Sequence, residues 1–86
     1  MHAVVVRVSI EDPESSQVVL REQVVPRIAA APGFVTGYWV ELPDKKGSSI
    51  VVFESEEAAR AAQGQIQPPP NVTIDFNEVG EVVAQA

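Results

Sequence analysis

The chain has no cysteine among its 86 residues. This excludes disulfide bonds, thiolate metal ligands and a cysteine nucleophile. Histidine occurs once, as His2, so we expect neither a metal site built from imidazoles nor a bound cofactor. There is also no glycine-rich phosphate loop, and Ser48 and Ser49 have no histidine partner. Nucleotide binding and a serine triad are therefore not predicted.

Basic residues and long apolar runs are also scarce. Lys and Arg number 6 against 12 Asp and Glu, which gives a net charge of −6. Nucleic-acid binding requires a clustered basic face, so we expect no nucleic-acid partner. No apolar run approaches the roughly 18 residues of a membrane span, and no cationic and apolar leader is visible. We expect a cytoplasmic protein with no membrane contact, folded as a single domain over residues 1–86 with a thin core.

What the sequence does contain is an alternation of strand and helix patterns. Asp12 and Pro13 are typical of a helix start, and Pro26 is expected to interrupt that helix at Val25. Ser15 is an alternative cap. Strands are predicted over 2–10, 34–42, 48–54 and 71–83, and helices over about 13–31 and 55–66.

The resulting order, βαββαβ, predicts an α+β fold of the ferredoxin-like type. In this fold a four-stranded antiparallel sheet carries two helices on one face. The first strand should lie centrally, beside the fourth. Near Glu78 the alternation of the last strand slips, which predicts a bulge or break close to Gly80. The tail beyond it either pairs with another chain or frays.

Alternation along the strands gives the sheet two predicted faces. The even positions are almost wholly apolar and are expected to face the helices. The odd positions should face solvent and be polar, as in antiparallel sheets with one wet side. They nevertheless hold a set of large apolar residues, which predicts a homodimer interface: Val5, Val35, Trp39, Val51 and Phe53. The alternative is a scatter of ordinary surface hydrophobes.

Four residues are candidates for ligand binding. Tyr38 is an even position, so its hydroxyl is expected in the core beside the alanine-rich second helix, where an apolar small molecule would fit. The alternative is an ordinary core tyrosine. Arg7, Asp75 and Asn77 should be near neighbours on the odd face, as a paired charge cluster or as a site for an anion or polar ligand.

Several short motifs together resemble one protein family. They are V-V-P in the first helix, the junction Pro32-Gly33-Phe34, the hairpin, and F-E-S-E-E-A over 53–58. This pattern covers nearly the whole chain and is similar to the antibiotic biosynthesis monooxygenase-like proteins of the dimeric α+β barrel superfamily. The resemblance implies a ferredoxin-like protomer whose sheet packs face to face with that of a second copy. For some members it also implies cofactor-independent oxidation of polycyclic aromatic substrates, or haem binding and degradation.

The resemblance does not extend to the haem chemistry. Haem-degrading relatives use a histidine on the second helix together with a tryptophan and an asparagine, and residues 55–66 contain no histidine. We therefore expect a homodimeric, non-catalytic domain that assembles or binds an apolar small molecule between sheet and helices. The alternative is a cofactor-independent monooxygenase that acts on an electron-rich aromatic compound.

Overall fold

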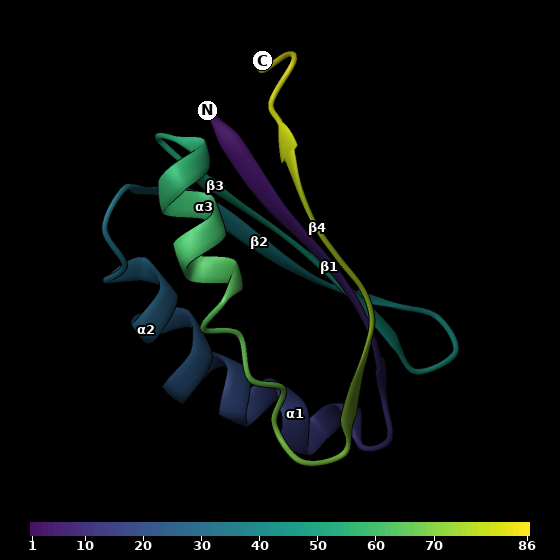
Figure 1. The fold of residues 1–86 in the computed structure, drawn as a ribbon. Helices are drawn as coiled ribbons and strands as arrows, with labels where there is room; N and C mark the ends of the chain where they lie inside the picture. Colours follow the sequence, from purple (N-terminus) through teal and green to yellow (C-terminus); the bar gives the residue numbers. More distant parts are fainter.

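Segments rich in β-branched residues form the sheet of this protein. A computed structural model describes residues 1–86 and shows an α+β fold of the ferredoxin-like type (Figure 1). The four antiparallel strands lie in the order β2-β3-β1-β4, so the first strand is central and beside the fourth, as predicted. Their bounds are His2–Ile10 for β1, Phe34–Leu42 for β2, Lys46–Phe53 for β3 and Val72–Glu81 for β4.

All helices cover the same face of the sheet (Figure 1). The first helical segment consists of α1 (Pro13–Val19), the π-helical turn η1 (Leu20–Val24) and α2 (Val25–Ala29). Asp12 caps it, because its carboxylate accepts a 3.4 Å hydrogen bond from the backbone N–H of Ser15.

Proline explains the wide turn in the middle of this segment. Pro26 has no N–H to donate, and its ring would collide with the carbonyl one turn earlier in a regular helix. Over η1 the backbone widens, and the N–H of Val25 donates to the carbonyl of Leu20. The predicted interruption at Val25 is therefore confirmed, and it takes the form of a π-turn.

The second helix, α3 (Glu56–Gln63), lies close to the sheet. Ser55 caps it, because its Oγ accepts a 3.1 Å hydrogen bond from the N–H of Ala58. Gly33 lies directly against this helix with a φ of 79°. A Cβ at this position would come 2.8 Å from the Cβ of Ala58, so the junction before β2 requires glycine.

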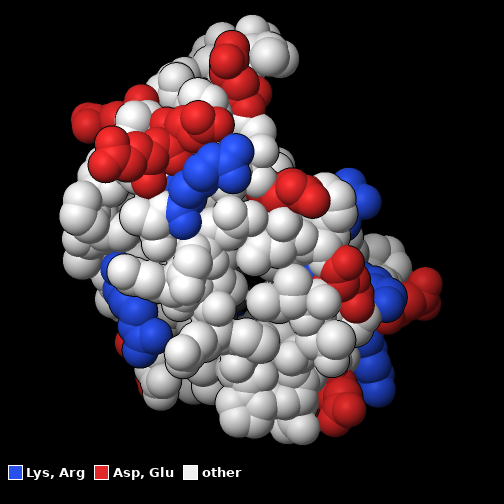
Figure 2. Space-filling view, in the orientation of Figure 1, with Lys and Arg blue, Asp and Glu red and all other residues white.

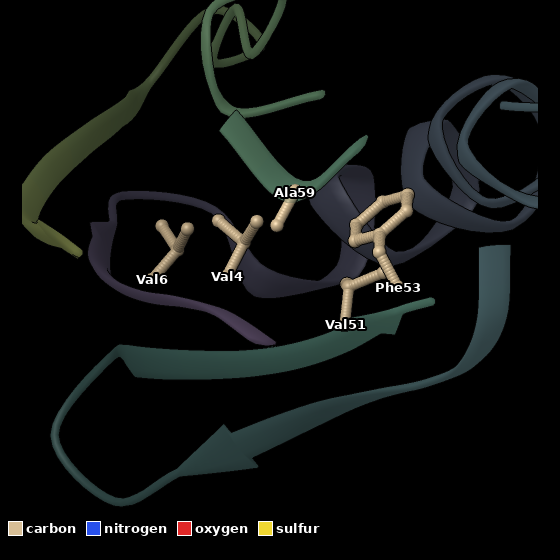
Figure 3. Packing of buried hydrophobic residues seen from close by; sticks show 5 residues of the cluster. All are labelled: Val4, Val6, Val51, Phe53 and Ala59. Carbon is tan, nitrogen blue, oxygen red and sulfur yellow. The ribbon is translucent and has the colours of Figure 1, made fainter. Parts of the chain in front are cut away.

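The core lies between α3 and the two central strands. Figure 3 shows four side chains that rise from β1 and β3 toward Ala59 of α3, which completes the cluster: Val4, Val6, Val51 and Phe53. Phe34 packs edge to face on Phe53, with ring centroids 6.3 Å apart. Only 7 of the 86 residues are buried, which confirms that the protomer has a thin core.

Both edge strands contain one extra residue that resets the alternation of side chains. On β2 this residue is Val35, because Phe34 lies opposite Phe53 whereas Thr36 already lies opposite Val52. On β4 it is Asp75, so the bulge lies five residues before the predicted position near Gly80. Beyond each bulge, the side chains of the strand point to the opposite side from the one that parity alone predicts.

The prediction that odd positions face away from the helices is therefore wrong beyond the two bulges, and it is also wrong on β3, where the register with β1 places the odd positions on the helix side. Val51 and Phe53 are core residues, with 4% and 1% of their surface exposed, and Trp39 packs against the same cluster. Tyr38, predicted to point into the core, is instead 65% exposed. It lies opposite Ile50, which in turn lies opposite Val5, on the face that the helices leave uncovered.

We call this uncovered side of the sheet the outer face. Val5 belongs to it, as predicted, and Val35 is exposed at the bulge of β2. The register adds further large apolar residues from β2, β3 and β4, all of which were predicted to face the helices: Tyr38, Val40, Ile50 and Phe76.

Candidate ligand-binding cavity

An apolar cavity of about 500 Å³ lies between the sheet and the helices. Of the 27 residues that line it, 16 are hydrophobic. Small-molecule sites in proteins typically measure about 300–1,000 Å³ and are lined mainly by apolar side chains. The cavity therefore has the size and the chemistry of a binding site for a small apolar molecule.

The uneven height of the helices above the sheet creates this space. Ala59 of α3 is fully buried, so α3 packs on β1, β3 and β4, whereas α1 and η1 lie farther from the strands. Leu20 and Val24 of the π-turn line the cavity from above, and Val6 and Val8 line it from below. In Figure 2 a small recess opens near the middle of the molecule, bordered by uncharged residues. One group of acidic residues lies over the start of α3, and others lie along the right side of this view.

Trp39 of β2 forms part of the cavity wall. Its ring lies over Gly37, because a Cβ on that glycine would come 3.0 Å from Trp39 Cη2 and 3.1 Å from Cζ3. The sequence contains a signal for this arrangement, since glycine within a strand often marks the close approach of another group. Trp39 is also the only tryptophan of the chain, so its fluorescence reports on this cavity alone.

Three hydrogen-bonded polar side chains form what we call the mouth of the cavity: Gln17, Arg21 and Glu41. Gln17 Nε2 donates to Glu41 Oε2 over 2.6 Å, and Gln17 Oε1 accepts from Arg21 over 3.3 Å. Of the side-chain hydrogen bonds in the structure, only the one between Gln17 and Glu41 joins the first helical segment to the sheet. Sequence reasoning missed these residues, because 24 positions separate the two partners and no motif contains both.

The structure does not bring the predicted ligand-binding residues together. Arg7 lies over the ring of Phe76, with its guanidinium carbon 5.7 Å from the centroid. Asp75 accepts a 2.6 Å hydrogen bond from the Ser9 hydroxyl and lies 3.8 Å from Lys46 Nζ. Asn77 lies on the helix side of the sheet.

The amide oxygen of Asn77 accepts a 3.1 Å hydrogen bond from Gln63 of α3. The bulge at Asp75 explains the separation, because it places Phe76 beside Arg7 and turns Asn77 to the other face. Tyr38, the fourth candidate, lies on the outer face and does not line the cavity.

No group of three or more His, Asp or Glu side chains in the structure is arranged to hold a metal ion. None of the helices has the length and apolar character needed to cross a membrane. Neither the protein-family models nor the curated protein sequences compared with this chain match it.

Proposed function

We propose that this protein binds an apolar small molecule in the cavity between its sheet and its helices, and that it does so as a homodimer. The observation that carries the proposal is the cavity itself, about 500 Å³ in volume and lined mainly by hydrophobic residues. Because this space is open to solvent, its apolar walls face water and lack packing partners there. A ligand in the cavity supplies the missing contacts and stabilises the folded state.

The geometry favours binding over oxygenation of an aromatic compound. Arg21 and Glu41 are the only charged residues that line the cavity, and both are exposed at its mouth. A general base must lie within hydrogen-bonding reach of the proton that it removes. The apolar wall around Trp39 offers contact area for a ligand but no such base.

The outer face supports the homodimer. Four strands spaced about 4.8 Å apart, each eight or so residues long, present roughly 500 Å² of flat surface. Two such faces together have an area of about 1,000 Å², which is the lower bound of the surface that a specific interface buries. Protruding side chains add to this area. Apolar side chains occupy the middle of this surface. Lys46 and Asp75 form an ion pair, and both of these side chains are exposed. The topology and the uncovered face agree with the resemblance to the antibiotic biosynthesis monooxygenase-like proteins.

A neutral, apolar dye such as N-phenylnaphthylamine tests the cavity. Bound dye should gain fluorescence and quench Trp39 by energy transfer. Ala62→Phe should weaken binding about tenfold, or ~1.4 kcal/mol, because Ala62 lines the cavity and the ring would fill it. Ala61→Phe is the matched control, since Ala61 is the exposed neighbour on the same helix. Equal dye affinity in the two variants, or no quenching of Trp39 in the wild type, would contradict the proposal.

A further inference from the structure

We infer that the ligand of the cavity carries a neutral hydroxyl group, which binds at the mouth formed by Gln17, Arg21 and Glu41, and that the two charges there reject ionised ligands. The inference rests on the proposed function, because it concerns the same cavity. The three side chains of the mouth form one hydrogen-bonded row. The amide of Gln17 lies between the guanidinium and the carboxylate and bonds to both.

Both charged groups of the mouth have hydrogen-bonding capacity left. The guanidinium of Arg21 has five N–H groups, and one hydrogen bond from it is present, to Gln17 Oε1. Glu41 accepts one hydrogen bond, from Gln17 Nε2, and its second oxygen is free to accept another. The mouth therefore offers a donor and an acceptor on either side of one amide. A hydroxyl matches this pair, because it accepts through its oxygen and donates through its proton.

An ionised head group cannot use both sides. A carboxylate can bond to Arg21 but is then held against the carboxylate of Glu41, which already contacts the same amide. An ammonium group can bond to Glu41 but is then held against the guanidinium. Like charges so placed repel each other, and the apolar cavity behind the mouth offers an ion no other partner. The mouth as a whole is electrically neutral and favours a dipole over either ion.

Three ligands with the same ten-carbon chain test this inference: decanol, decanoate and decylamine. Decanol is titrated below its solubility limit and the two ions below their micellar concentrations, all at pH 7, and Trp39 emission is recorded. Because the mouth is exposed and the repulsion is screened by solvent, we expect decanol to bind about fivefold more tightly than either ion. Glu41→Gln should raise the affinity for decanoate, and Arg21→Gln should raise the affinity for decylamine. Glutamine at position 41 still accepts from Gln17, so the link between helix and sheet is kept.

Matched controls separate the local charge from the net charge of the chain. Glu57→Gln and Arg27→Gln change the net charge by the same amounts, but both residues are exposed and do not line the cavity. They should leave all three affinities unchanged. If the three ligands bind equally to the wild type and to both mouth variants, this inference is overturned while the proposed function stands. If none of them alters Trp39 emission, the proposed function fails and the inference fails with it.

Discussion

Val35 and Asp75, the two extra residues in the sheet, decide where the aromatic side chains that follow them on β2 and β4 point. Parity places Phe34 on the helix side correctly, but the bulge at Val35 then turns Trp39 inward and Tyr38 outward. The sequence does not reveal this change of side-chain direction, because β3, the neighbouring strand, has no polar face that would identify its solvent side. Ile50 and Val51 are both apolar, so either one satisfies a hydrophobic core.

A substitution of Gly37 tests whether the ring of Trp39 packs against this glycine. Gly37→Ala should push the indole away from β2, shift its emission to longer wavelength, and lower the free energy of unfolding by about 1 kcal/mol through overcrowding. Urea denaturation followed by fluorescence measures both effects. Gly80→Ala is the control, because a Cβ at Gly80, also on an edge strand, would have no neighbour within 4 Å. Equal effects of the two substitutions would show that Trp39 does not rest on Gly37.

Local signals in the sequence predict the helices and strands well. Asp12 with Pro13, Pro32 with Gly33, and Ser55 each mark a boundary that the structure confirms, because caps and turns depend on residues within a few positions of one another. The cavity follows from a different cause. It depends on the height of α1 and η1 above the sheet, which the packing of the whole chain sets.

The cap of α3 gives a test at the level of one helix. Ser55→Ala should lower the free energy of unfolding by about 1 kcal/mol, because the N–H of Ala58 loses its hydrogen-bond acceptor. Ser15→Ala serves as the control, since the hydroxyl of Ser15 makes no hydrogen bond in the structure and the residue is exposed. Chemical denaturation followed by circular dichroism compares the two. A loss in the Ser15 variant as large as that in the Ser55 variant would argue against a capping role.

The whole molecule has two apolar regions and only one of them is enclosed. The core and the cavity lie on the helix side of the sheet, and the outer face leaves Tyr38, Ile50 and Phe76 in contact with solvent. Sequence reasoning correctly predicts an apolar surface on the sheet, because both strand faces are too hydrophobic for one core. It assigns Val5 and Val35 to that surface correctly. It assigns Trp39, Val51 and Phe53 to it wrongly, because the bulges and the register are properties of the folded sheet.

A charge in the middle of the outer face should therefore prevent the proposed homodimer. Ile50 is 47% exposed on β3, a central strand, and Ile50→Glu should weaken association by at least about 2 kcal/mol because the carboxylate would be buried without a partner. Val18→Glu is the control, since Val18 is 52% exposed on α1, away from the sheet face. Sedimentation velocity at micromolar concentration gives the mass of each. A monomeric wild type, or dissociation caused equally by both variants, would exclude this interface.

The positions of the two bulges also bear on aggregation. Both lie on edge strands, β2 and β4, whereas β1 and β3 pair with each other without irregularity. A bulge twists an edge and spoils its ladder of free backbone groups, which makes it a poor template for another strand. Sheet extension from one molecule to the next, the route to open-ended fibrils, is thereby discouraged at both ends. Self-association through the outer face, as we propose it, would instead be complete with two copies related by a two-fold axis and would grow no further.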